Sequence, residues 1–366
     1  MGGFVMKKCA LLLCFSLILF SFFGCIFRQK SEQPTASSPA PESPVVSASP
    51  ALENLTVEDY FPILENVRYV YQGDGNEYAS YDVYIDYTYR TKVQQRINNG
   101  GTELAQVIEI KNGSAASVFS LEEYYYRENL LDKTGVTEET LLMEPIKTGT
   151  SWKLGDGSVR TISGTDVKID TPSGAYSTVS VETIYKIGGT STDYYAKGFG
   201  LVKTVSKGEG YEVTSSLSEI QENAFFKRTV RFYYPNINDS KLYYKDREID
   251  FKTNDITRSV LETVYKEQFE GRPGAVLSEN TKINSLYLND DGMVYLDLDK
   301  DFIKEMNAGA VYEMMILQCV ANTFGTYYGA DKVILTIDYS LYESGHIKLQ
   351  KGQFLSVKTE DSVEIS

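Results

Sequence analysis

Between Val57 and Leu217 the chain is a succession of short segments in which apolar and polar residues alternate, and this limits the fold more than any other feature. Residues 81–87 and 105–110 show the alternation most clearly. A period of two places every second side chain on one face of a strand, so that this face is buried while the other meets water. Turns such as Gly73-Asp74-Gly75 and Gly155-Asp156-Gly157 separate the segments. Residues 57–220 are therefore predicted to form a mainly antiparallel β domain: a curled sheet, a sandwich or a half-barrel.

Residues 226–358 show a different pattern, in which strands and helices both occur. Apolar residues at helical spacing predict one helix, which Asn254 or Asp255 caps and which ends near Gly271. A second, strongly apolar helix is predicted over 310–324. Strands are predicted over five segments: 229–234, 241–250, which can return beside the first, 282–288, 293–298 and 333–338. The segments 282–288 and 293–298 flank the hairpin turn Asn289-Asp290-Asp291-Gly292. We expect a small α/β domain with two helices on a mixed sheet, which makes the chain α+β, and a tail over 359–366.

The first 24 residues have the composition of a secretory signal peptide. Lys7 and Lys8 precede an apolar run that ends at Phe23 and is shorter than the roughly 20 residues of a permanent membrane helix. The sequence that ends in Phe22-Phe23-Gly24-Cys25 resembles a bacterial lipobox, with Phe22 where Leu is usual. The resemblance implies cleavage before Cys25 and acylation of this residue. The alternative is an ordinary cleaved signal peptide in which Cys25 has no role.

A spacer follows the leader. Residues 26–56 hold five of the ten prolines among many Ser and Ala residues, a composition that cannot bury a core and that forms extended linkers. A linker directly behind a lipidated Cys25 lifts a folded body off a membrane. The expected location is therefore the outer face of the bacterial cytoplasmic membrane, where the acyl chains on Cys25 bind the lipid.

Composition removes several classes of function. The 366 residues carry 36 Lys and Arg against 50 Asp and Glu, a net charge of −14, whereas nucleic-acid binding needs clustered basic residues. One His and four Cys leave few ligands for zinc and few partners for a His-based triad. The sequence contains no nucleophile elbow, P-loop or dinucleotide fingerprint. We expect no nucleic-acid partner, no cofactor and no metal.

Individual candidates for chemistry each have a simpler structural interpretation. Cys319 lies in an apolar helical stretch without a nearby base, which favours a core thiol over a nucleophile. His346 has no adjacent ligand or nucleophile in the sequence, which favours a surface or partly packed residue. Asp297, Asp299 and Asp301, joined by Asp290 and Asp291, suggest a calcium site. In a calcium loop the glycine follows the aspartates, but here Gly292 precedes the row of Asp297, Asp299 and Asp301, which favours a solvated strand end.

Aromatic residues and carboxylate pairs give equally weak signals. Trp152 is expected to pack across the sheet, with an exposed binding residue as the alternative. Tyr124-Tyr125-Tyr126 reads as a strand segment with rings on both faces. Glu122-Glu123 and Glu138-Glu139 are ordinary in an acidic protein and do not imply glycoside hydrolysis. No catalytic constellation is predicted.

The second segment resembles the GerMN domain of bacterial sporulation and spore-germination lipoproteins. The residues that carry the resemblance lie throughout 226–358: the tyrosine-rich opening strand, Leu286 to Leu298, Asp301-Phe302, Gln318 to Phe324, Lys332 to Asp338, and Gly345 to Leu349. Tyr339 departs from the family pattern, which has Gly after the final strand. The first segment is similar only to uncharacterised secreted β domains, on phrases such as Gly149-Thr150-Ser151-Trp152.

The resemblance implies a protein without catalytic residues that acts through protein assembly at the envelope. We therefore expect a lipid-anchored, non-enzymatic protein of sporulation or spore germination whose GerMN-like domain binds an envelope partner or its own copies, through a sheet edge or a helix face. The alternative is a carrier lipoprotein that holds a lipid or a cell-wall fragment in the β-rich domain. A hydrolase that uses scattered carboxylates is the third hypothesis.

Overall fold

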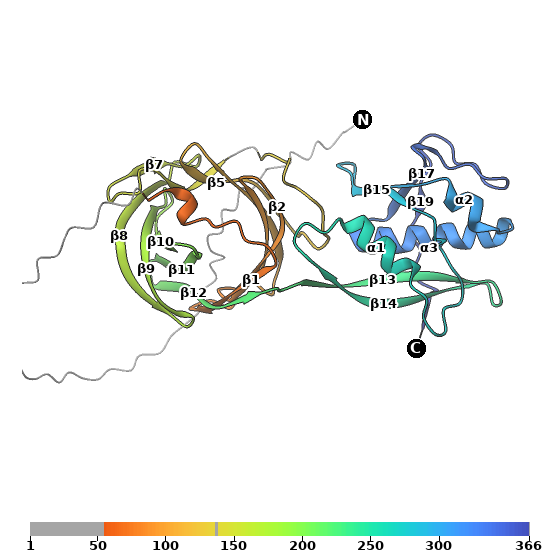
Figure 1. The fold of residues 1–366 in the computed structure, drawn as a ribbon, viewed down its shortest axis with the longest axis horizontal. Helices are drawn as coiled ribbons and strands as arrows, with labels where there is room; N and C mark the ends of the chain where they lie inside the picture. Colours follow the sequence, from red (N-terminus) through yellow and green to blue (C-terminus); the bar gives the residue numbers. More distant parts are fainter. Residues whose placement is uncertain (1–54, 136–137, 366) are drawn as a thin grey trace, which may run out of the picture. The chain divides into compact units, whose positions relative to one another are not determined.

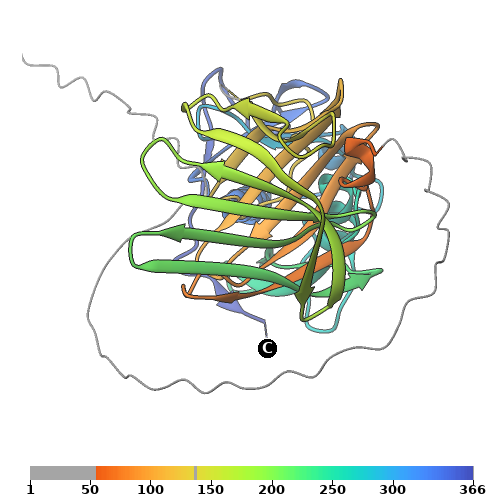
Figure 2. The same ribbon diagram turned by 90° about the vertical axis from the view of Figure 1, so that its left-hand side faces the viewer.

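The computed structural model describes residues 55–135 and 138–365, so the signal-peptide and most of the linker prediction lies outside the described residues. Asn54–Ser366 forms one compact unit. Its first half is a 12-stranded sheet, which follows the short 3-10 helix η1 (Val57–Asp59) and which Figures 1 and 2 show curling round on itself. The strands are β1 (Val67–Asp74), β2 (Tyr81–Tyr89), β3 (Lys92–Asn98), β4 (Glu103–Lys111), β5 (Ser114–Glu122), β6 (Glu139–Met143), β7 (Ser151–Lys153), β8 (Val159–Thr171), β9 (Gly174–Ile184), β10 (Thr190–Ala196), β11 (Gly200–Gly208) and β12 (Tyr211–Glu222).

Neighbouring strands of this sheet all pair antiparallel, in the order β6-β5-β4-β3-β2-β1-β12-β11-β10-β9-β8-β7. Residues from strands far apart in this order pack together in one core. Val93 and Ile110, on β3 and β4, share that core with Val179 and Tyr195, on β9 and β10. These strands can meet only across the concave face of a curled sheet. Of the predicted alternatives, the curled sheet is therefore the one that the structure has.

Side chains join the two ends of the strand order, β6 and β7. The indole N–H of Trp152 on β7 donates to the carbonyl oxygen of Thr140 on β6, 3.0 Å away. The guanidinium group of Arg160 on β8 donates to the same carbonyl at 2.7 Å and to the Glu139 carboxylate at 2.5 Å. The curled sheet is therefore closed at this seam by Trp152 and Arg160.

The second half contains three α-helices and two further sheets. Its helices are α1 (Thr257–Lys266), α2 (Asp301–Met306) and α3 (Ala310–Tyr328). The long hairpin of β13 (Phe226–Asn236) and β14 (Lys241–Phe251) pairs with β20 (Val363–Glu364). The other sheet has five strands: β15 (Ile283–Leu288), β16 (Val294–Leu298), β17 (Lys332–Ile337), β18 (Ser340–Leu341) and β19 (Leu355–Ser356).

Helix α3 lies between these two sheets, as Figure 1 shows. The hydroxyl group of Thr323 on α3 accepts the backbone N–H of Tyr233 on β13 at 3.0 Å. On the opposite side a Cβ atom at Gly325 would lie only 2.2 Å from Cγ2 of Val357, so the close approach of the chain there requires glycine. A helix covered on both sides is apolar all round, which explains the strongly apolar sequence that predicted it.

The predicted hairpin is confirmed, and two details of the predicted first helix change. β15 and β16 pair antiparallel around the 289–292 turn, where Gly292 has φ +78°. Helix α1 has Ile256 at its N-cap, because Asn254 instead accepts the backbone N–H of Thr88 and Asp255 accepts that of Lys252. α1 also ends at Lys266, before Gly271, because Glu267 is extended.

Two segments contain structure that the sequence did not predict. The short helix α2 begins at Asp301, where the aspartate row had been assigned to a strand end, so that the domain has three helices where two were expected. The predicted tail 359–366 contains β20, which pairs in parallel with Tyr243 and Tyr244 of β14.

Candidate functional site

The described residues place most sequence candidates in structural roles. Cys25 lies outside them. Cys319 is a free thiol, fully buried in α3, and burial raises its pKa well above the ordinary value. His346 is exposed. Trp152 is packed in the concave core, as predicted. The three tyrosines 124–126 follow β5 in a loop instead of a strand, with Tyr124 buried and Tyr125 exposed.

The aspartate row does not form a metal site. Asp297 is 2% exposed, and its carboxylate accepts the hydroxyl group of Thr336, the backbone N–H of Tyr339 at 2.7 Å and the Asn284 amide at 2.8 Å. The prediction of a solvated strand end is therefore wrong for Asp297. Throughout 55–135 and 138–365 no three His, Cys, Asp or Glu side chains lie close enough to hold a metal ion.

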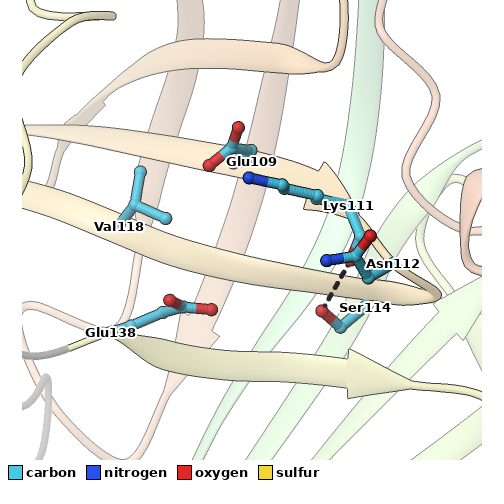
Figure 3. Close-up of a pocket in the computed structure, with 6 residues that line it drawn as sticks. All are labelled: Glu109, Lys111, Asn112, Ser114, Val118 and Glu138. Atoms are coloured by element: carbon cyan, nitrogen blue, oxygen red, sulfur yellow. Dashed lines mark hydrogen bonds between the residues drawn. The ribbon is translucent and has the colours of Figure 1, made fainter.

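A small open pocket lies beside the β4–β5 turn. It has a volume of about 190 Å³ and is lined by Glu109, Lys111, Asn112, Ser114, Val118 and Glu138, as Figure 3 shows. The Ser114 hydroxyl donates to the Lys111 carbonyl oxygen at 3.0 Å, which belongs to the turn itself. One lysine between two carboxylates supplies neither a nucleophile with its base nor an oxyanion site. The pocket therefore has the chemistry of a solvated surface.

A polar row crosses the concave face of the curled sheet, and sequence reasoning missed it. Arg160, 6% exposed, links Glu139 of β6 to the Thr183 hydroxyl of β9, which accepts from the guanidinium at 3.0 Å. Farther along, Asp193 of β10 accepts the hydroxyl group of Thr204 of β11 at 2.6 Å, and burial raises the pKa of Asp193. These residues come from five strands, β6, β8, β9, β10 and β11, so no local sequence signal connects them.

A buried ionic network joins the curled sheet to the second half. Arg127, 1% exposed, lies in the loop after β5 and donates to the carbonyl oxygens of Asp86 on β2 at 2.7 Å and of Lys252 after β14 at 2.9 Å. Its guanidinium group lies over the rings of Tyr87 and Phe251, at 4.1 Å and 5.1 Å from the centroids. Arg228 of β13 pairs with Glu103 of β4 at 2.7 Å. These contacts hold the two halves together.

The outer edge of β15 is occupied by side chains. Glu262 of α1 accepts the backbone N–H of Ile283 at 2.8 Å, and Arg258 donates to the carbonyl oxygen of that residue at 3.1 Å. At the other end of the strand Glu128, from the loop after β5, accepts the N–H of Leu288 at 2.7 Å. Edge strands offer unpaired backbone groups to other chains, and on β15 the N–H and C=O of Ile283 and the N–H of Leu288 already have partners.

One face of the five-stranded sheet carries apolar side chains and no helix. α3 packs on the face that contains Val294, Leu296, Val333 and Leu335, which are buried. The opposite face, which we call the open face, contains Tyr287, Tyr295, Ile334 and Leu341. Tyr287, Tyr295 and Ile334 are neighbours across β15, β16 and β17, and the two tyrosine rings stack with centroids 5.6 Å apart. Tyr287 is 41% and Leu341 44% exposed.

Tyr339 lies next to the open face in a strained conformation. Both Asp338 and Tyr339 have left-handed backbones, with φ of +45° and +63°, and Tyr339 is 74% exposed. The Asp297 carboxylate holds the turn by accepting the Tyr339 N–H. Ile337 pairs with Ser340 across these two residues, so they form a two-residue hairpin turn between β17 and β18, a type of turn that places both central residues at positive φ and favours Gly or Asn. The sequence signal was the departure of Tyr339 from the Gly that the resemblance to GerMN domains implies at this position.

No curated protein matches this chain. Among solved structures, an exported protein with a YmcC-like fold from Bacteroides fragilis has 13% identity and a TM-score of 0.30, over 44% of this chain and 99% of the other. The tandem GerMN domains of the sporulation protein GerM from Bacillus subtilis have 16% identity and a TM-score of 0.28, over 39% of this chain and 49% of the other. The first GerMN domain of the same protein has 20% identity and a TM-score of 0.24, over 38% and 96%.

No functional conclusion rests on structural likenesses at these scores. In the part of the chain that the structure describes, no helix is long and apolar enough to span a membrane. The predicted resemblance of the second half is confirmed by a match of sequence: residues 231–340, from β13 to β18, match the Germane family, described as sporulation and spore germination.

Proposed function

We propose that this chain is a non-catalytic, lipid-anchored envelope protein of sporulation or spore germination, in which residues 226–358 bind another protein. The observation that carries the proposal is the match of residues 231–340 to the family of sporulation and spore germination. Location at the outer face of the cytoplasmic membrane, with acyl chains on Cys25, rests on the leader and the lipobox-like sequence.

The chemistry of the described residues supports a binding role. The carboxylates that the fold buries are used in hydrogen bonds and ion pairs within the structure: Glu103 binds Arg96, Asp297 binds Thr336 and Asn284, and Glu262 binds Lys266. The buried thiol of Cys319 has a raised pKa, which opposes thiolate chemistry. By contrast, the open face leaves apolar side chains in water, which is typical of surfaces that bind proteins.

The test is chemical cross-linking of the tagged, full-length protein in living cells, during growth and during spore formation. We expect capture of one specific envelope protein, lost on deletion of residues 226–358 and reduced when Cys25→Ser releases the protein from the membrane. A deletion strain with normal spore yield and germination would contradict the sporulation role. Capture that persists without residues 226–358 would contradict the assignment of binding to this domain.

The polar row on the concave face favours a second candidate function, in which the curled sheet binds a polar ligand such as a cell-wall fragment. Asp193, which is part-buried and bonded to Thr204, would then contact the ligand, because Arg160 is already engaged at the seam by Glu139 and Thr140. A thermal shift of the full chain with muropeptides, absent in Asp193→Asn, would favour this function. No shift with muropeptides or with lipids would leave protein binding alone.

A further inference from the structure

We propose that the open face, together with Tyr339, is the surface that binds the partner, and that it takes a segment rich in Lys and Arg from another protein. This inference rests on the proposed function and deepens it. It names the surface within residues 226–358 and the chemistry of what binds there.

The first argument is that the edge of the sheet is already used. Binding by strand addition requires free N–H and C=O groups along an edge strand. On β15 those of Ile283 are taken by Glu262 and Arg258, and the N–H of Leu288 is taken by Glu128. Another strand could not pair with β15 without displacing three side chains from α1 and from the loop after β5. Strand addition at β15 is therefore blocked, and we assign binding to the open face of the same sheet.

The second argument is the conformation of Tyr339. A left-handed backbone at φ +63° is unfavourable for any residue with a Cβ, and a large aromatic side chain gains nothing in return when it is 74% exposed. A role in folding would be served better by Gly at this position. The two-residue turn between β17 and β18 requires this backbone and would accept Gly, so we attribute the tyrosine at this position to what its ring contacts in a complex.

The third argument identifies the partner by charge. Asp291 lies at one end of the open face, where its carboxylate accepts the Tyr295 hydroxyl at 2.9 Å. Asp338 lies at the other end, within 3.5 Å of the Asn284 amide. Asp290 is exposed in the same turn as Asp291, and Lys332 is the one cation of β17, with its amine 4.7 Å from the Phe354 ring.

Exposed tyrosine rings between carboxylates match Lys and Arg side chains, which stack on the rings and pair with the acids. A second copy of this chain fits poorly, because face-to-face contact would set Asp290, Asp291 and Asp338 against the same residues in a protein of net charge −14. The surface therefore favours a basic partner over a homo-oligomer.

The experiment places a photoreactive phenylalanine analogue at position 339 of the full-length protein in spore-forming cells. The same analogue at Ile237, an exposed residue at the end of the β13–β14 hairpin, is the matched control, and a third position, Val311 on α3, samples another exposed apolar surface. The captured peptide is sequenced. We expect position 339 to capture a segment with an excess of Lys and Arg, and positions 237 and 311 to capture none.

Variants then test each part of the surface. Tyr287→Ser and Tyr339→Gly are each expected to reduce chemical capture of the partner about fivefold or more, the effect of truncating a central aromatic residue. The double variant Asp291→Asn, Asp338→Asn is expected to reduce chemical capture of the partner and to make the remaining capture less dependent on salt concentration, because two of the charges that attract the partner are removed. Because Tyr339→Gly relieves strain, it should lose capture while the protein becomes no less stable, which separates loss of a contact from loss of the fold.

Several results would overturn the inference while the proposed function stands. In the photo-cross-linking experiment, these results are that the protein captures its own copies, that position 311 captures a partner and position 339 does not, or that the captured segment has no excess of Lys and Arg. In the variant series, the contradicting result is that Tyr339→Gly leaves chemical capture of the partner unchanged. If position 339 captures nothing while chemical cross-linking still finds a partner that needs residues 226–358, the open face is the wrong surface. If neither experiment finds a partner, the proposed function itself fails.

Discussion

Tyr339 combines an unfavourable left-handed backbone with a side chain that lies on the surface. Its left-handed conformation belongs to the two-residue turn between β17 and β18, the buried Asp297 carboxylate accepts its N–H, and its side chain is largely exposed. Asp193 is a second residue that the fold holds at a cost, since its carboxylate is removed from water with one hydroxyl group as hydrogen-bond donor. We therefore expect Tyr339→Gly and Asp193→Asn each to stabilise the protein.

Replacement of Tyr339 by Gly is expected to stabilise the chain by about 0.5–1 kcal/mol. A left-handed residue with a Cβ costs about 1–2 kcal/mol, and the greater entropy of Gly in the unfolded chain takes back about 0.5–1 kcal/mol. Urea unfolding measures the difference. Tyr89 is the control, because it is 61% exposed and has no left-handed backbone, so Tyr89→Gly should destabilise. Equal losses in both variants would refute strain at Tyr339.

Asp193→Asn is expected to raise stability at neutral pH, with a gain that disappears in acid. Burial raises the pKa of Asp193 above its ordinary value of 3.8, so the folded state binds the proton more tightly than the unfolded chain does. The penalty from the ionised carboxylate is therefore absent below about pH 3.8 and grows as the pH rises through the folded pKa. The Asn side chain keeps an amide oxygen that can accept the hydroxyl group of Thr204, so this hydrogen bond is preserved. Unfolding free energies of both proteins between pH 3 and 8 test this, and a pH-independent difference would contradict it.

At the scale of elements, β15 shows how this domain combines a closed edge with an open face. Charged side chains from α1 and from the loop after β5 satisfy the backbone groups of the edge, so the strand is protected from unwanted pairing. Glu262 is central to this arrangement, since it accepts both the Ile283 N–H and the amines of Lys266 and Lys282.

Removing the charge of Glu262 is expected to weaken the attachment of α1 to β15 and to reduce the acid sensitivity of the protein. Burial raises the pKa of Glu262, but the hydrogen bonds from Lys266, Ile283 and Lys282 outweigh it, so the pKa lies below the ordinary 4.5. Its stabilisation is complete above about pH 4.5 and is lost as the pH falls through the folded pKa. Glu262→Gln should therefore lower stability at pH 7 and flatten its decline in acid. Glu267→Gln, in the exposed pair with Arg247, is the control with little expected effect.

At the scale of the whole molecule, the two halves share a buried ionic junction. Arg127 donates to backbone carbonyl groups that belong to both, and Arg96 pairs with Asp86 and Glu103 at 3.0 Å and 2.6 Å while lying over the Phe226 ring at 4.3 Å. Removal of one member leaves other buried polar groups without partners, which is far more costly than loss of a surface pair. We therefore expect the halves to unfold together.

Arg127→Met is expected to cost about 3–5 kcal/mol and to separate the unfolding of the two halves. Trp152, the only tryptophan, reports on the curled sheet by fluorescence, while the α-helices of the described chain all lie beyond residue 256 and report on the second half by circular dichroism. The two signals should coincide in the unmodified protein and diverge in the variant. Arg231→Met, which breaks an exposed pair with Asp246, is the control, with a loss of about 0–1 kcal/mol. Coincident signals in Arg127→Met would contradict the role of the junction.

Local pattern was sufficient for the elements that depend on near neighbours. Strands with alternating residues, the 289–292 hairpin and the apolar helix α3 were all predicted, because a strand needs one buried face, a tight turn needs Gly, and a helix between two sheets needs apolar residues all round. The likeness of the second half to the sporulation family was also readable from residues in order along the chain.

Tertiary structure alone decided how these elements are used. Asn254 and Asp255 are good helix caps, but distant backbone groups compete for them, so α1 begins without a side-chain cap. Arg127 and Arg96 look like ordinary charged residues until the fold buries them against residues far away in the chain. Residue order along the chain specifies which faces of strands and helices are apolar. Which of these faces are covered depends on long-range packing, because burial of a face needs partners that no local pattern contains, and the open face beside Tyr339 is one that stays uncovered.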